Sequence, residues 1–360
     1  RDLAPSPDGA RLAFTVMGDV YVKDLPDGDP EHIASMEAMA AQPAWSPDGE
    51  RIVFATYSDA EGGQLYTVDY DGDDLERITA EPAFYTQPVF SPDGARVVAI
   101  RGPRSAYEEA LTQGVPRGSR ELVWVPSTGG EASVITAISG LGAPHFVSGS
   151  DRIYATQSGT GLVSMRWDGT DRREHVQVRG GSPNGGQGPA ASIIKMAPEG
   201  DEAMALVGNQ LYVVTVPYGV GAEAPTISVA NPSSASFPAE QLTDIGAQFP
   251  AWGPDGREVH WALGNAHFVY DLDAAQAFAD SVEAAEAAEA AEEVDEEETE
   301  DEEAEDEDEE EDDDARYRPA ESRIMVEVDR DIPVGVLALT GARIITMNGD
   351  EIFERGDIVI

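Results

Sequence analysis

The chain has 360 residues and a formal charge of −46, which makes nucleic acid and anionic membranes poor partners for its surface. It contains no cysteine, so disulfides, thiolate metal sites and cysteine nucleophiles are excluded. No apolar run is long enough for a signal peptide or a membrane helix, and the length allows one large repeat domain plus part of another.

A short turn phrase recurs along the chain, and an alternating apolar run follows it each time. Ser-Pro-Asp-Gly occupies residues 6–9, 46–49 and 91–94, and Gly-Pro-Asp-Gly occupies residues 253–256. Proline fixes φ at the first corner, Asp bonds to the backbone that follows it, and Gly takes the positive φ that ends a tight turn. The β-branched and aromatic residues that follow predict a strand after each turn.

Two decayed copies of the turn extend the repeat. Residues 144–151 and 195–200 precede strand-like runs in the same frame. A second strand pattern follows each of the copies, at residues 19–22, 64–68, 121–125, 161–165, 210–214 and 266–270. Four short strands in each unit, repeated six times, predict an all-β fold, namely a six-bladed β-propeller of four-stranded blades.

The turn also carries a family resemblance. Residues 42–54 read Gln-Pro-Ala-Trp-Ser-Pro-Asp-Gly-Glu-Arg-Ile-Val-Phe, which resembles the repeat of TolB-like (WD40-like) propellers. The resemblance covers residues 1–272. The same repeat precedes tricorn-type proteases, prolyl-oligopeptidase relatives and some amidohydrolases, so it implies an architecture, and propellers host many functions.

Two stretches interrupt the blades. Residues 102–120 are polar and contain several Pro and Gly, which predicts a long loop inside the third blade. Residues 180–189 are Gly-rich, but no Lys-Ser/Thr follows them, so a plain surface loop is favoured over a phosphate-binding loop.

The composition changes at residue 273. Residues 273–315 begin as an Ala/Glu-rich helix former and become a run of Glu and Asp; residues 283–314 include 23 acidic residues and no basic one. This insertion is predicted to be a frayed helix followed by disordered chain, in preference to a calcium site, because it lacks the spacing of a calcium loop. The alternating strand that follows, within residues 322–331, is predicted to complete the last blade.

Residues 333–360 carry the functional hint. They contain Leu-Thr-Gly-Ala-Arg-Ile at residues 339–344, an Asn-Gly turn, and Gly-Asp-Ile-Val-Ile at residues 356–360, which predicts a hairpin of two strands. This stretch resembles the opening of the small β-sandwich of the amidohydrolase superfamily, a domain that follows TolB-like propellers in one group of amidohydrolases. The chain starts at Arg1 and stops inside an apolar run, so we expect it to be a piece of a longer protein.

The amidohydrolase resemblance implies a (β/α)₈ barrel with a divalent metal, usually zinc, and the residues of that site would lie beyond residue 360. The histidines form no His-x-His pair and are interpreted as structural; they are His32, His145, His175, His260 and His267. No Gly-x-Ser-x-Gly elbow occurs. The recurring aromatic residues are assigned to the core between blades; they are Trp45, Phe90, Phe146 and Trp252. No catalytic, cofactor-binding or metal-binding residue is therefore predicted within residues 1–360.

Three functions remain open. The leading one is the propeller region of a metal-dependent amidohydrolase, in which the propeller docks or gates a peptide-like or small amide substrate for its own C-terminal catalytic domain. The second is a non-catalytic, protein-binding TolB-like propeller of the cell envelope, and the third is the propeller of a prolyl-oligopeptidase-type serine peptidase. The resemblance implies a periplasmic or secreted location in each case, with neither a nucleic-acid partner nor a membrane span.

Overall fold

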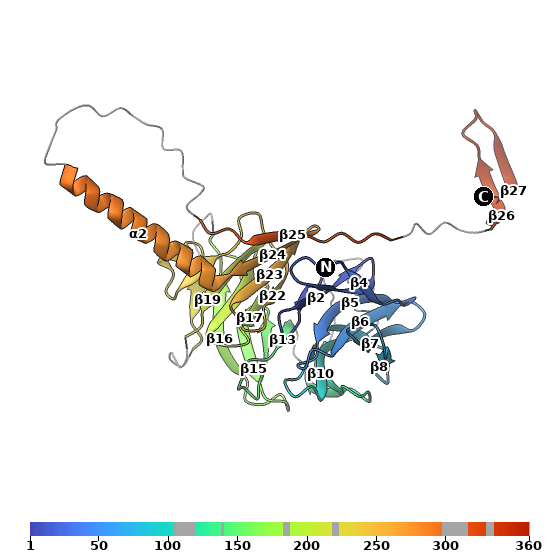
Figure 1. Ribbon diagram of the computed structural model, residues 1–360. Helices are drawn as coiled ribbons and strands as arrows, with labels where there is room; N and C mark the ends of the chain where they lie inside the picture. The colour runs from blue at the N-terminus through green and yellow to red at the C-terminus, as the bar shows by residue number, and fades with distance from the viewer. Residues whose placement is uncertain are drawn as a thin grey trace. The chain divides into compact units, whose positions relative to one another are not determined.

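The computed structural model describes residues 1–103, 105, 120–137, 140–182, 188–217, 223–296, 316–328 and 335–359. The chain divides into two compact units, Arg1–Met325 and Val326–Ile360. The first unit is a six-bladed β-propeller of mostly four-stranded blades, and its blades follow one another in chain order (Figure 1). The fold class predicted from the repeats is therefore confirmed.

Each blade contains an antiparallel meander of four strands. Blade 1 contains β1 (Ala4–Pro5), β2 (Arg11–Val16), β3 (Asp19–Asp24) and β4 (Glu31–Ala34); blade 2 contains β5 (Met39–Trp45), β6 (Arg51–Ser58), β7 (Gly62–Asp69) and β8 (Glu76–Arg77); blade 3 contains β9 (Phe84–Phe90), β10 (Arg96–Gly102), β11 (Glu121–Pro126) and β12 (Ser133–Thr136). Blade 4 contains β13 (Leu141–His145), β14 (Ile153–Gln157), β15 (Gly161–Met165) and β16 (Arg173–Arg179); blade 5 contains β17 (Ile193–Met196), β18 (Glu202–Val207), β19 (Gln210–Thr215) and β21 (Ala239–Gln241); blade 6 contains β22 (Gln248–Trp252), β23 (Glu258–Leu263), β24 (Ala266–Asp271) and β25 (Ala320–Arg323).

The repeated turn forms as its residue types predict. In the second copy, Gly49 has φ +74° and its N–H donates to the Ser46 carbonyl at 3.0 Å. The Asp48 carboxylate accepts from the Glu50 N–H at 3.1 Å, and the Ser46 hydroxyl accepts from the Arg51 N–H at 2.9 Å. The same bonds recur in the turns at residues 6–9 and 91–94, so each turn delivers its second strand in the same register.

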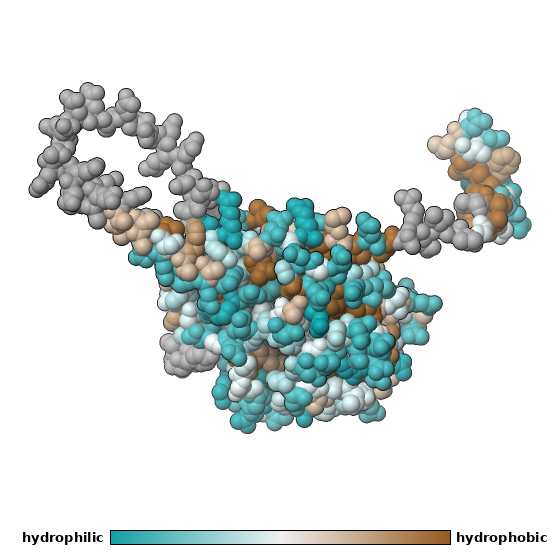
Figure 2. All heavy atoms as spheres, in the orientation of Figure 1, coloured by the Kyte–Doolittle hydropathy of each residue, from teal (hydrophilic) through white to brown (hydrophobic). Residues whose placement is uncertain are grey.

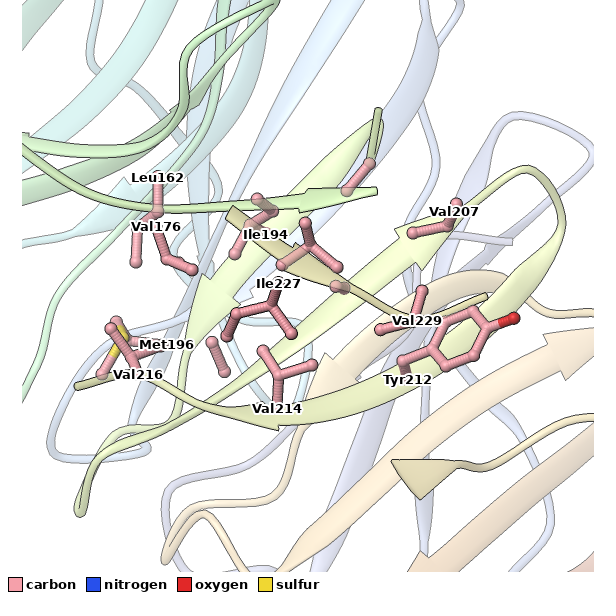
Figure 3. Close-up of a cluster of buried hydrophobic side chains, with 14 residues drawn as sticks. Leu162, Val176, Ile194, Met196, Val207, Tyr212, Val214, Val216, Ile227 and Val229 are labelled. Carbon is pink, nitrogen blue, oxygen red and sulfur yellow. The ribbon is translucent and has the colours of Figure 1, made fainter. Parts of the chain in front are cut away.

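Apolar side chains fill the interfaces between neighbouring blades. Between blades 4 and 5, Leu162 and Val176 lie against Ile194 and Val214, and all of them are buried (Figure 3). Equivalent clusters join blades 1 and 2, 2 and 3, 3 and 4, and 5 and 6. A single blade cannot cover both of its faces, so each blade depends on its neighbours for a core.

Blades 6 and 1 meet through their turns and their first strands, which closes the ring. A Cβ atom placed on Gly9 of blade 1 would lie 3.6 Å from Pro254 of blade 6. The Arg1 guanidinium lies over the ring of Phe249, 5.6 Å from its centre.

One strand has no counterpart in the sequence-based prediction, and the bounds of another differ from the predicted ones. β20 (Thr226–Ser228) pairs in parallel with β16 and adds a fifth strand to blade 4, although it follows β19 of blade 5 in the chain; a short 3₁₀ turn, η1 (Pro232–Ser234), comes after it. β25 pairs antiparallel with β24 as the fourth strand of blade 6. This strand begins two residues before the predicted range of 322–331 and ends at Arg323.

Helix α2 (Leu272–Glu296) follows β24 directly. The Asp271 carboxylate caps its first turn by accepting from the N–H groups of Asp273 and Ala274, both at 2.9 Å. Leu272 and Ala275 are buried against blades 5 and 6. Of the predicted acidic segment, residues 297–315 lie outside the described residues, as do residues 104, 106–119 and 183–187 of the two predicted loops. None of the helices in the described ranges has the length and apolarity needed to cross a bilayer.

The second unit is a hairpin of β26 (Ala338–Ile345) and β27 (Ile352–Val359), which pair antiparallel with irregular register. Its large apolar side chains are exposed, among them Leu339, Ile345 and Phe353. Figure 2 shows brown, hydrophobic residues over its surface. A two-stranded hairpin is marginally stable alone and needs a further layer to bury such a face.

Candidate functional site

The first strands of all six blades surround one cavity of about 480 Å³, which we call the channel cavity. Its walls come from β1, β5, β9, β13, β17 and β22 and from the turns that follow these strands. Most of the wall is apolar, with Trp45, Phe146, Phe249 and Trp252 among its residues. A cavity of this volume lies within the usual range for small-ligand pockets.

Most of the first strands bend at the same place. Register shifts interrupt β5, β9, β13 and β22. A non-glycine residue with left-handed φ sits at each bulge, and Asp2 takes the same conformation beside β1; the four residues are Gln42 (φ +58°), Gln87 (φ +55°), Ala143 (φ +50°) and Phe249 (φ +53°). Proline follows each of these four residues, and because proline has no N–H to give to the ladder, it suits a bulge. The sequence analysis missed this feature, although the repeated x-Pro step before the blade aromatic was its signal.

The bulges free backbone N–H groups, and side chains from the preceding blade bond to them. Gln42 N–H donates to Asp2 Oδ2 at 3.3 Å, and Gln87 N–H donates to Gln42 Oε1 at 2.7 Å. Ala143 N–H donates to Gln87 Oε1 at 2.7 Å. These bonds link blades 1 to 4 in sequence around the channel cavity.

Further side-chain hydrogen bonds join blades 1 and 2, blades 5 and 6, and blades 4 and 5. Trp45 Nε1–H donates to the Ala4 carbonyl at 2.8 Å, and Trp252 Nε1–H donates to the Lys195 carbonyl at 3.0 Å. Met196 N–H donates to His145 Nε2 at 3.0 Å. The aromatic residues that the sequence assigned to the core do pack between blades, and Trp45, Phe146 and Trp252 also line the cavity.

Gln87 joins blade 3 to blades 2 and 4 through these bonds, so replacing it should lower the free energy of unfolding measurably. Replacing Gln87 with Ala removes the acceptor for Ala143 N–H, so we expect the free energy of unfolding to fall by about 1 kcal/mol in urea. Gln87→Glu keeps a side-chain oxygen and should retain most of the stability. Gln276→Ala, on the exposed face of α2, is the control and should change stability by less than about 0.5 kcal/mol. Equal losses of stability for Gln87→Ala and Gln276→Ala would contradict the role of Gln87 in joining the blades.

His145 reaches the channel cavity but is already fully bonded. Its Nδ1–H donates to the Ala143 carbonyl at 2.9 Å, while Nε2 accepts from Met196. Burial lowers the pKa of His145 to about 3, so the ring stays neutral at physiological pH. Neither nitrogen is free to bind a metal or to accept a proton from a substrate.

The other histidines lie away from the channel cavity. His260 Nδ1 and His267 Nε2 are 3.1 Å apart in the buried part of blade 6, and burial lowers the pKa of His267 to about 3. His175 Nε2 lies 2.7 Å from Ser164 Oγ, and burial lowers the pKa of His175 to about 4. Within the described ranges, no group of three or more His, Asp or Glu side chains is arranged to hold a metal ion.

Comparison with known protein families shows what the propeller is similar to. Residues 3–119 match the family model of PD40, the TolB beta propeller domain. Over these residues the chain is similar to the TolB propeller. A search of curated protein sequences gives no match.

Several solved structures have a similar fold. The gluconolactonase of Xanthomonas campestris has a TM-score of 0.53 at 14% identity, covering 75% of this chain and 85% of that one. The hydrazine synthase of Kuenenia stuttgartiensis has a TM-score of 0.51 at 15% identity, covering 76% of this chain and 44% of that one. A putative TolB of Agrobacterium tumefaciens scores 0.46 at 15% identity, covering 67% of this chain and 90% of that one. At these identities the likeness concerns the fold alone.

None of these comparisons supports an amidohydrolase domain in residues 333–360. That resemblance, with its zinc site, stays a prediction.

Proposed function

We propose that this chain is a protein-docking propeller of the cell envelope, and that an extended segment of a partner protein enters the channel cavity. The observation that carries the proposal is the cavity itself: all six blades line it, its walls are mostly apolar, and inter-blade hydrogen bonds hold its rim. Such a preformed apolar pocket binds without a large ordering cost. The TolB-like repeat supports the same assignment and the expected periplasmic or secreted location.

The chemistry of the walls favours binding over catalysis. His145 is neutral with both nitrogens bonded, and Asp2 already accepts from Thr15 and Gln42. Neither is placed as a general base with an adjacent nucleophile. The apolar rings and prolines around them suit an apolar segment of chain instead.

Site-specific photo-crosslinking in cells tests this proposal within a single blade. We expect p-benzoylphenylalanine at Val89, on first strand β9, to form an adduct with one partner of discrete mass. The matched position is Val134, on fourth strand β12 of the same blade, which is 49% exposed and should give no such adduct. Adducts from position 134 and none from position 89 would overturn the proposal.

A second function rests on the hairpin of β26 and β27. Its exposed apolar side chains call for a further layer, and an amidohydrolase sandwich would provide one. In that case the propeller would dock or gate substrate for a metal-dependent barrel. The coding sequence after residue 360 tests it: Gly-x-x-Asp-x-His-x-His supports an amidohydrolase, Gly-x-Ser-x-Gly supports the serine peptidase, and a stop codon supports docking alone.

A further inference from the structure

Lys195 is a cationic residue of the channel cavity, and it differs in type from the residues at the same register of the other first strands. The residues at the same register in the other first strands are small, apolar or neutral; they are Ala4, Ala44, Val89, His145 and Ala251. β17, which carries Lys195, pairs with β18 in continuous register, without the bulge found in β5, β9, β13 and β22. Lys195 is also one of only two lysines in the chain.

The peptide group that joins Lys195 to Met196 is held by hydrogen bonds to two other blades. Its carbonyl accepts from Trp252 of blade 6, and the N–H of the next residue, Met196, donates to His145 of blade 4. The side chain therefore leaves a rigid point on the wall and contributes to the lining of the cavity.

Among the described residues of the cavity wall, Asp2 carries the carboxylate, and no ion pair joins it to the Lys195 ammonium group. Burial alone lowers the pKa of Lys195, and no carboxylate raises it. The residue is half-buried, and its neighbours in the cavity wall are largely apolar. A charged group in such surroundings is costly unless it is paired, so an unpaired lysine here destabilises the empty propeller.

We propose that Lys195 anchors a carboxylate carried by the partner segment that docks in the channel cavity. This inference rests on the proposed docking function and adds the chemistry of its ligand. One monoanion neutralises one ammonium, whereas a phosphate dianion would leave a charge unpaired between apolar walls. The apolar remainder of the segment would lie against Trp45, Phe249 and Trp252.

A matched pair of probes tests the anchor: N-acetyl-Phe-Leu with a free carboxylate, and the same dipeptide as its carboxamide. Binding is followed by calorimetry and by the indole N–H signals of the five tryptophans, because Trp45 and Trp252 line the cavity and the others do not. We expect the acid to shift these two signals and to bind about 10- to 100-fold more tightly than the amide. Lys195→Met should remove the preference and Lys195→Arg should keep most of it. Arg166→Met removes a positive charge outside the cavity and should change nothing.

The remaining outcomes distinguish failure of the Lys195 anchor from failure of the docking function. If acid and amide shift Trp45 and Trp252 with equal affinity, also in Lys195→Met, the anchor is wrong and docking stands. If neither probe shifts those signals, the docking function fails and the anchor fails with it. Inorganic phosphate that competes as strongly as the acid would show a free-anion site and overturn the segment as the source. The melting temperature gives a check without ligand: Lys195→Met should raise it, whereas a lysine with a purely structural role would lower it.

Discussion

Lowering the pH from 7.5 to 5 should reduce the free energy of unfolding by about 2 kcal/mol for each of His145 and His267. Both are held neutral in the folded state, where burial lowers the pKa of each to about 3. The unfolded chain takes up these protons near pH 6.5, so it binds more protons than the folded chain throughout this window. Stability is thus fully present above pH 6.5 and falls as the pH drops toward the folded pKa values.

Urea unfolding at several pH values between 5 and 7.5 measures this slope. Most carboxylates stay ionised in the window, including Asp8, Asp48 and Asp93, whose pKa values the turn serines lower. His145→Gln should remove about a third of the slope, because His267 and His175, whose pKa burial lowers to about 4, also contribute. His32→Gln is the control, because His32 is 39% exposed beside Asp19. An unchanged slope in His145→Gln would show that His145 is not buried in its neutral form.

The largest single-residue loss is expected for Arg152→Met, at about 2–3 kcal/mol. The Arg152 side chain is 9% exposed and donates to Ser164 Oγ and to Asp171 Oδ2, both at 2.8 Å. Removing it would take these bonds away, together with the donor to the Ser164 carbonyl. Asp171 would keep Arg173 at 2.9 Å, and Ser164 Oγ would keep His175 at 2.7 Å. The loss is large because the Arg152 side chain is buried, and charged groups away from water depend on the hydrogen bonds that they make.

Arg11 offers a matched control, because it follows the same turn in blade 1. Its side chain is 30% exposed, lies 3.3 Å from Asp24 and stacks over Tyr70. Arg11→Met should therefore cost only about 1 kcal/mol. Equal losses in the two variants, measured by denaturation at pH 7, would mean that the network around Arg152 contributes no more than an exposed ion pair.

The blades could be predicted from the sequence because each turn depends only on residues that are adjacent in the chain. The glycine of each Ser-Pro-Asp-Gly must take positive φ, as Gly49 does, and the strand that follows starts at a fixed offset. The decayed copies at residues 144–151 and 195–200 were recognised by their frame alone, and β14 and β18 lie where that frame put them.

The remaining features depend on contacts between distant residues. The parallel pairing of β20 with β16 joins segments that no local pattern connects. The bond from Gln87 N–H to Gln42 Oε1 requires that two blades be placed side by side. Lys195 lies in a decayed repeat. That it is the charged residue among small, apolar or neutral ones can be seen only when the six first strands are aligned by register.

Hydrogen–deuterium exchange in the presence of the partner captured at position 89 tests the central claim most directly, since it reports where on the propeller that partner binds. Docking in the channel cavity predicts slower exchange in the first strands β5, β9, β13, β17 and β22. Slower exchange confined to the outer strands β4, β8 and β12 would contradict it.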